Sequence, residues 1–163
     1  MQKNLLRLAL IVSFGSVIVA NASAQGPYDW SQWRGPQRDG ICKETGLLKT
    51  WPKEGPPLVW KVAGIGGGYS TPSVANGKIF GMSYQADNET VWALDEKNGA
   101  KIWEVKIASK GKVGYNEGSR CTPTVDGKNL YVVGVSGDVV CLESNSGKIL
   151  WQKNFAKDFK GKM

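Results

Sequence analysis

VWALDEKNGAKIW (residues 91–103) and VVCLESNSGKILW (residues 139–151) are two copies of one pattern, and they align without a gap at an offset of 48 residues. Upstream of each copy, STPSVANGKIF (residues 70–80) aligns with CTPTVDGKNLY (residues 121–131) at an offset of 51. The difference of three residues falls between Phe80 and Val91, and a longer hairpin loop in the first copy would account for it. A repeat of this length indicates an architecture of successive supersecondary units.

Each copy is expected to form four short β-strands joined by tight turns. The strands are predicted at 71–74, 78–82, 90–95 and 101–107, and again at 122–125, 129–133, 138–143 and 149–154. The connections supply glycine, asparagine or aspartate where a turn needs positive φ, as at Asn98-Gly99 and Asp126-Gly127. Four antiparallel strands per unit are typical of a propeller blade. The sequence therefore predicts an all-β chain with two four-stranded antiparallel blades of a partial β-propeller.

The segment from Ala93 to Trp103 has the form A-x-D-x-x-N-G-x-x-x-W, and Cys141 to Trp151 repeats it with cysteine and glutamate at the first two positions. Both resemble the tryptophan-docking motif of PQQ-type propellers, the superfamily of quinoprotein alcohol dehydrogenases and of BamB-like outer-membrane assembly proteins. The resemblance implies that the alanine leaves room for the tryptophan of a neighbouring blade, and that the acidic residue and the glycine fix the turn into the outermost strand. The residues expected to serve this structural docking are Ala93, Asp95, Gly99, Trp103, Cys141, Glu143, Gly147 and Trp151.

Residues 1–24 have the features of a secretory signal peptide. Lys3 and Arg7 precede an apolar run at 8–20, and Ala22-Ser23-Ala24 follows it as a small-residue cleavage site. The run is shorter than the roughly 20 residues that a membrane-spanning helix needs. We therefore expect cleavage after Ala24, a periplasmic or secreted mature chain, and no membrane span after cleavage.

The mature chain divides into a lead-in segment at 25–57 and the propeller repeats at 58–163. Trp30-x-x-Trp33-Arg34-Gly35-Pro36 is similar to the lead-in of secreted PQQ-like proteins, and residues 58–62 match the outermost strand of a blade whose other strands are not upstream. A ring needs about four to eight blades, whereas two blades and one orphan outer strand are present. The chain is therefore expected to be a truncated part of a larger propeller, with the remaining blades or other proteins as partners. Closure of the ring by several copies of the chain is the alternative.

Charge and cysteine content limit the choice of partners. The net charge of +7 falls to +5 when Lys3 and Arg7 leave with the signal, and the remaining lysines are scattered rather than gathered in a stripe, so no nucleic-acid partner is expected. The three cysteines include Cys121 and Cys141, both in the second repeat. Their alignment with Ser70 and Ala93 favours packing as small buried residues, although a bridge between them remains open.

The sequence has no histidine, which excludes Ser-His-Asp and Cys-His catalysis and histidine-dependent metal sites within it. Gly64 to Gly68 lacks the lysine of a P-loop and is interpreted as a connecting loop. In propellers of the resembled superfamily, ligands bind near the central funnel, next to the start of the innermost strands. The residues at that position are Tyr69, Ser70, Ser119, Arg120 and Cys121.

Arg120 is the candidate cofactor-binding residue, because a guanidinium near the axis suits a carboxylate-bearing ligand such as PQQ. Its alternative role is to satisfy loop carbonyls. The function that the resemblance favours is a non-catalytic binding or assembly scaffold. The competing hypothesis is part of a quinoprotein dehydrogenase that uses PQQ and calcium to oxidise alcohols or sugars, with ligands supplied by blades outside this sequence.

Overall fold

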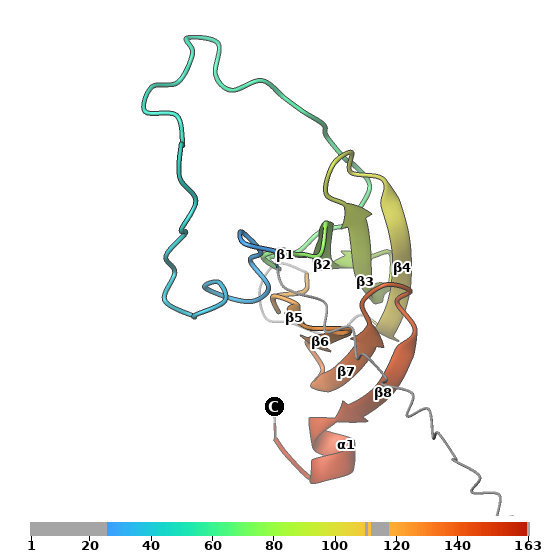
Figure 1. Cartoon of the computed structure of the whole chain (residues 1–163). Helices are drawn as coiled ribbons and strands as arrows, with labels where there is room; N and C mark the ends of the chain where they lie inside the picture. Colours follow the sequence, from blue (N-terminus) through green and yellow to red (C-terminus); the bar gives the residue numbers. More distant parts are fainter. Residues whose placement is uncertain (1–25, 110, 112–117, 163) are drawn as a thin grey trace, which may run out of the picture.

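The computed structural model describes residues 26–109, 111 and 118–162. Within them, two four-stranded antiparallel sheets follow one another in chain order (Figure 1). Blade 1 comprises β1 (Ser73–Ala75), β2 (Lys78–Gln85), β3 (Asn88–Asp95) and β4 (Lys101–Ser109), and blade 2 comprises β5 (Thr124–Asp126), β6 (Asn129–Val133), β7 (Asp138–Glu143) and β8 (Ile149–Asn154). The expected fold class, a partial propeller of two blades, is confirmed. The expected signal peptide lies outside the described residues.

The extra residues of the first repeat lengthen strands rather than a loop. β2 and β3 each have eight residues and are joined at Ala86 and Asp87, whereas β6 has five and β7 has six. Ser83 pairs with Thr90 and Tyr84 pairs with Glu89 in the added part of the ladder. The expectation of a longer loop was wrong, because the inserted residues continue the backbone hydrogen bonding of the hairpin.

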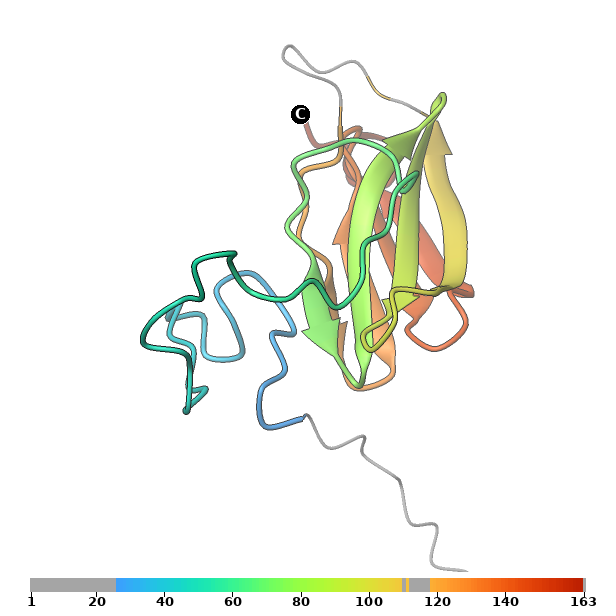
Figure 2. The same cartoon turned by 90° about the horizontal axis from the view of Figure 1, so that it is seen from above.

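The hydrophobic core lies between the two sheets (Figure 2). Alternate side chains of blade 1 face blade 2, as strand geometry requires. The buried residues that form this core are Ala75, Phe80, Met82, Val91, Ala93, Trp103 and Ile107 from blade 1, and Val125, Leu130, Val132, Val140 and Leu142 from blade 2. The stability of each blade therefore depends on its neighbour.

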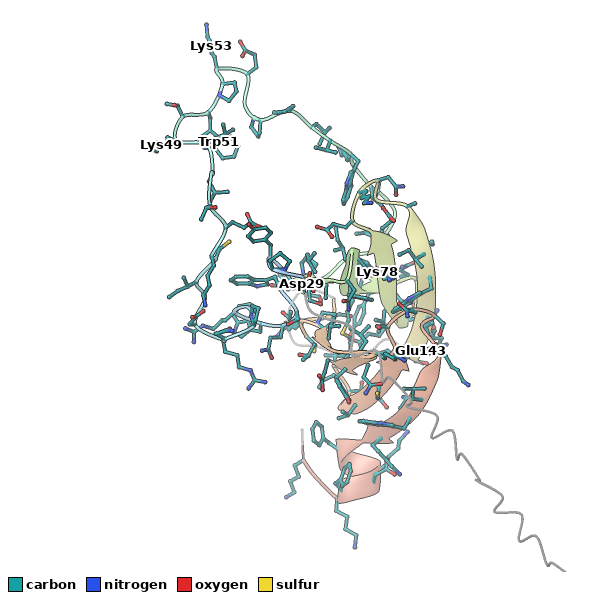
Figure 3. The ribbon with its side chains drawn as sticks, viewed as in Figure 1. Asp29, Lys49, Trp51, Lys53, Lys78 and Glu143 are labelled. Carbon is teal, nitrogen blue, oxygen red and sulfur yellow. The ribbon has the colours of Figure 1, made fainter. Side chains whose placement is uncertain are left out.

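The lead-in crosses the innermost strands of both blades. Trp30 pairs with Val74 through two backbone hydrogen bonds of 2.8 and 3.0 Å, and the Val125 N–H donates to the Ser31 carbonyl at 2.8 Å. After this contact the chain arches away from the sheets, and Lys49, Trp51 and Lys53 lie on the far side of the arch (Figure 3). The lead-in thus joins β1 to β5 through backbone hydrogen bonds.

The orphan outer strand predicted at 58–62 does not form a strand. A strand needs a neighbour to pair its backbone groups, and none lies beside this segment within the described residues. The chain also contains a five-residue helix that the sequence did not predict, α1 (Phe155–Phe159), whose first turn is capped by the Asn154 side chain. No helix among the described residues is long and apolar enough to cross a membrane.

Candidate functional site

The contact between the two blades is centred on Trp103 of β4. Its indole Nε1 donates to the Ser144 carbonyl of blade 2 at 3.1 Å, and its ring lies against Gly147. An added Cβ at Gly147 would stand 2.7 Å from the indole Cδ2, closer than real Cβ contacts. On its other side the ring packs on Phe80, with 6.0 Å between ring centroids. Trp103 therefore joins blade 1 to the β7–β8 turn of blade 2.

The turns that receive a tryptophan are built by the acidic and glycine positions of the motif. Asp95 Oδ1 accepts hydrogen bonds from the backbone N–H groups of Lys97 and Asn98 at 2.9 and 3.2 Å, and the Gly99 N–H donates to the Asp95 carbonyl. Gly99 has φ +71° and Gly147 has φ +72°, a conformation that favours glycine. A side chain at either position would also occupy the space of the indole.

The second copy of the turn is closed with different side chains. Glu143 takes the place of Asp95, and the Ser146 hydroxyl hydrogen-bonds to its carboxylate and accepts from the Lys148 N–H at 3.2 Å. The Gly147 N–H donates to the Glu143 carbonyl at 2.8 Å, as the Gly99 N–H does to that of Asp95. The longer glutamate is therefore compatible with the same turn.

Ala93 and Cys141 occupy equivalent positions in the two blades. Ala93 lies opposite Trp103 of its own blade, and Cys141 lies opposite Trp151 in the same way. A small side chain therefore lies opposite each tryptophan in the ladder of its own blade. Both are buried, at 0% and 1% exposure. The three cysteines are free thiols, and Cys121 and Cys141 are not bridged.

Trp60 makes the same contact as Trp103, one blade earlier. Its Nε1 donates to the Glu96 carbonyl at 3.0 Å, and an added Cβ at Gly99 would stand 2.7 Å from its ring. Glu96 and Ser144 each follow the acidic residue of their turn directly. Val62 lies against Gly99 as well, with its Cγ2 2.7 Å from the added Cβ, so Trp60 and Val62 together place the segment at 58–62, which has no strand partner among the described residues. Its spacing in the sequence did not reveal this, because the repeat aligns only from residue 70 onward.

Trp151 is the third tryptophan of the series and has no turn against it among the described residues. It packs on Tyr131, with centroids 6.2 Å apart, in the way that Trp103 packs on Phe80. Its exposed fraction is 44%, against 9% for Trp103. The outer face of blade 2 therefore presents an exposed tryptophan that packs on an aromatic ring of its own blade, as Trp103 does.

The residues beside the expected funnel form a second group, at the end of the blades opposite the β3–β4 turn. Tyr69 N–H donates to the Ser119 carbonyl at 2.8 Å, and the Ser70 hydroxyl donates to the Cys121 carbonyl at 2.6 Å. Arg120, the candidate cofactor-binding residue, is exposed there and makes no hydrogen bond or ion pair with the described part of the chain. The funnel residues are therefore brought together, and the Arg120 guanidinium faces solvent.

Ser70 and Cys121 have equivalent roles in the two blades. The Ser70 Oγ accepts from the Met82 N–H and the Cys121 Sγ accepts from the Val133 N–H, both at 3.3 Å. Burial raises the pKa of the Cys121 thiol, the hydrogen bond from Val133 lowers it, and the charge of Glu89 raises it. The two aligned positions therefore share a hydrogen-bonding role, but both side chains are half-buried rather than fully buried as the alignment predicted.

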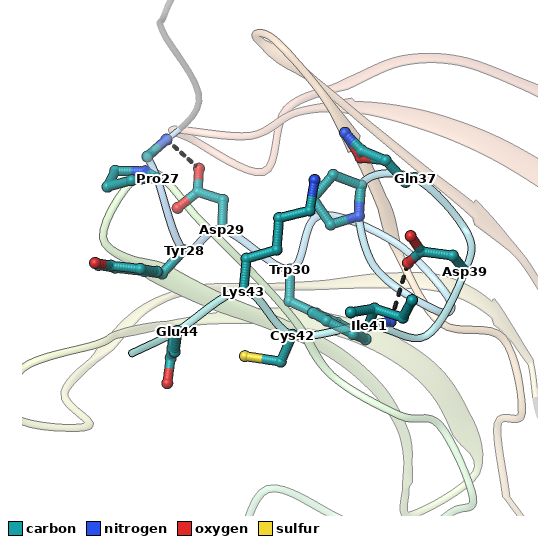
Figure 4. A pocket seen from close by; sticks show the side chains of 12 residues that line it. Pro27, Tyr28, Asp29, Trp30, Gln37, Asp39, Ile41, Cys42, Lys43 and Glu44 are labelled. Atoms are coloured by element: carbon teal, nitrogen blue, oxygen red, sulfur yellow. Dashed lines mark hydrogen bonds between the residues drawn. The ribbon is translucent and has the colours of Figure 1, made fainter. Parts of the chain in front are cut away.

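A further hollow of about 240 Å³ lies within the lead-in (Figure 4). Its walls include Tyr28, Trp30 and Ile41, with Lys43 between them. The nearby carboxylates of Asp29 and Asp39 are used locally, since Asp29 accepts from the Gly26 N–H at 2.9 Å and Asp39 from the Ile41 N–H at 2.9 Å. No group of three or more acidic, cysteine or histidine side chains that could hold a metal ion occurs among the described residues.

Comparison with known proteins places the chain in a family. Residues 42–163 match the family described as outer membrane protein assembly factor BamB. The chain belongs to this family. No curated protein matches it.

Solved structures show the propeller fold that the BamB family shares with quinoproteins. The quinohemoprotein alcohol dehydrogenase from Comamonas testosteroni has a TM-score of 0.58 and 20% identity, covering 87% of this chain and 21% of that chain. BamB from Moraxella catarrhalis has a TM-score of 0.46 and 20% identity, covering 61% of this chain and 28% of that chain. The chain thus spans less than a third of either structure.

Proposed function

We propose that this BamB-family chain is part of an exported propeller that acts as a non-catalytic binding or assembly scaffold. The observation that carries the proposal is the use of its motif residues: Trp103, Gly147 and their counterparts Trp60 and Gly99 hold one unit against the next. These residues are engaged in docking and are not aimed at a ligand. A rigid array of blades presenting its loops suits the recognition of other proteins.

The surface proposed to bind a protein partner is the loop end that carries Tyr69 and Arg120. Both side chains are exposed, and tyrosine and arginine are the residue types enriched at the centres of protein interfaces. The opposite end carries the β3–β4 turn, where the Glu96 N–H donates to the Gly77 carbonyl. The two ends can therefore be compared in one experiment.

Site-specific photo-crosslinking in a bacterial periplasm tests this surface. A benzoylphenylalanine in place of Tyr69 keeps an aromatic side chain, and the same probe at Asn98, exposed in the β3–β4 turn, is the matched control. We expect adducts from position 69 with a protein of the outer-membrane assembly machinery and none from position 98. Equal adducts from both positions, or none from either, would contradict the proposed surface.

The alternative is part of a PQQ- and calcium-dependent dehydrogenase, and the observation that favours it is the solvent-facing Arg120 at the funnel end. The described residues do not by themselves fit a calcium site, which takes six to eight oxygen ligands, because no acidic cluster is present among them. Any such ligands must come from outside the described residues. The two functions are distinguished by adding PQQ and calcium to the full-length protein and assaying dye reduction with alcohols. Dye reduction would contradict the scaffold proposal.

Export is proposed from the signal-like residues 1–24. Expression in a Gram-negative host with fractionation is expected to place the mature chain in the periplasm, and mass spectrometry is expected to find Gln25 as its first residue. A chain that keeps Met1 and stays with the cytoplasmic fraction would contradict this proposal.

A further inference from the structure

The lengthened β2–β3 hairpin of blade 1 reaches over the shorter hairpin of blade 2 and places a carboxyl group there. Glu89 lies in the added part of the ladder, opposite Tyr84, and it is 0% exposed. At the repeat offset of 48 its counterpart in blade 2 is Gly137, so only blade 1 carries this acid. The insertion therefore gives the interface a titratable group that the repeat itself does not require.

One oxygen of Glu89 holds the backbone of the other blade. Its Oε2 accepts from the Val135 N–H, in the β6–β7 connection, at 3.0 Å. The neighbouring Gly134 permits this approach, since a Cβ added there would stand 2.8 Å from the same oxygen. The hydrogen bond links residues 46 positions apart and crosses from one blade to the next.

The other oxygen, Oε1, is buried and makes no hydrogen bond of standard geometry with the described residues, and the same is true of the Ser119 Oγ. Ser119 nevertheless lies close enough to the carboxyl to act on its pKa. Asp138 of β7 also lies near enough to act on the carboxyl by its charge. A buried carboxylate with an unpartnered oxygen and a second acid beside it is costly, whereas a protonated carboxyl is neutral and gains a donor for Ser119.

We propose that Glu89 is a proton-dependent latch between the two blades, which seals their interface when the carboxyl is neutral and weakens it when the carboxyl ionises. The proton is exchanged with solvent and resides on Oε1. Oε2 keeps its bond to Val135 in both states, so ionisation loosens the contact without abolishing it.

The electrostatic environment of Glu89 favours the neutral form of its carboxyl group. Burial raises the pKa of Glu89 above its ordinary value of 4.5, Ser119 and the Val135 N–H lower it, and the charge of Asp138 raises it further. Within the described residues, the titratable groups that act on or pair with Glu89 are Asp138 of β7, Cys121 before β5 and Tyr84 of β2. None of them is a cation that would stabilise the ionised form.

The sign of the effect follows from linkage. A raised pKa in the folded state means that the folded chain holds this proton more tightly than the unfolded chain. Glu89 therefore favours folding at acidic pH, and its contribution declines as pH rises above 4.5 until the folded-state pKa is passed. Over that window the unfolding constant should rise about tenfold per pH unit, relative to a variant that cannot ionise at this position.

The first test is NMR of the intact chain. We expect the Glu89 carboxyl carbon to titrate above 4.5, with the Val135 amide proton shift following the same midpoint. Asp138→Asn should move that midpoint to lower pH because it removes the neighbouring charge. A Glu89 titration at or below the ordinary value, or a Val135 amide that does not follow it, would overturn the proposal.

The second test is urea unfolding from pH 4 to 9, with Glu89→Gln and Glu104→Gln as a matched pair. Glutamine at 89 keeps an acceptor for Val135 and cannot ionise, so E89Q should unfold at higher urea than the wild type at pH 8 and should lose the decline with pH. Glu104 has a lowered pKa through its bond from Gln85, so E104Q should shift the profile in the opposite direction. An E89Q profile that coincides with the wild type would also overturn the latch.

Discussion

The indole of Trp103 lies directly against Gly147 of the following blade, and the indole of Trp60 lies against Gly99 in the same way. In each pair the tryptophan N–H also donates to the carbonyl just after the acidic residue of the turn. The docking contact is therefore made once between two complete blades and once by a segment with no strand of its own.

Gly147→Ala should destabilise the chain strongly. Alanine at φ +72° is strained, and its Cβ would overlap the Trp103 ring, so we expect a loss of at least ~2 kcal/mol in the free energy of unfolding. Gly127→Ala is the matched control, because Gly127 also has positive φ (+56°) but no atom lies within 4 Å of an added Cβ. Equal losses in chemical unfolding would show that the docked indole is not the cause.

Trp103→Ala and Trp151→Ala compare the loss of stability on removing a tryptophan buried between blades with the loss on removing an exposed one. Trp103 is buried between blades, so its removal should cost about 3–5 kcal/mol, whereas Trp151 is 44% exposed and should cost ~1 kcal/mol. The measurement is urea unfolding, monitored by fluorescence at a single protein concentration. Similar losses for the two variants would mean that the outer face of blade 2 is covered in solution.

Trp60→Phe should release the segment at 58–62. Phenylalanine keeps an aromatic ring against Gly99 but loses the N–H that donates to the Glu96 carbonyl. We expect a loss of ~1 kcal/mol or less, and faster amide exchange or proteolysis near residues 58–62 without change in the blades. If the protease pattern of the wild type persists, Trp60 does not hold this segment.

The three thiols should differ in reactivity. Cys42 is exposed, whereas burial raises the pKa values of Cys121 and Cys141 and keeps these thiols protonated. A thiol reagent at neutral pH should modify one cysteine rapidly in the folded chain and all three after denaturation without reductant. Only one reactive thiol after denaturation would instead reveal a bridge between Cys121 and Cys141.

Glu104 should contribute stability that is lost in acid. Its pKa is lowered by the hydrogen bond from Gln85 and by Lys101, whose Nζ lies 3.0 Å from the carboxylate. Stability from such a group is present above the ordinary value of 4.5 and disappears as pH falls through the lowered pKa. Gln85→Ala should raise the NMR-measured pKa of Glu104, and Lys97→Ala, which removes an exposed lysine outside this contact, should not.

The sequence by itself determined the two blades. The offsets of 48 and 51 gave the number of repeats, and alternating apolar residues with turn glycines located all eight strands to within about two residues at most of their ends, apart from the lengthened β2–β3 hairpin. These features are local, because strand and turn preferences act over a few residues. Trp103 and Trp151 were visible for the same reason, since each lies at a fixed distance from the turn of its own repeat.

Only the tertiary structure decided which surfaces those residues meet. It placed Ala93 beside the tryptophan of its own blade, showed Trp60 docked without a strand, and brought Glu89 to the Val135 backbone across the interface. It also showed that the extra residues of the first repeat lengthen two strands, where a longer loop was expected. Contacts between residues tens of positions apart depend on how the sheets stack and on what is buried between them, and no spacing along the chain encodes that distance.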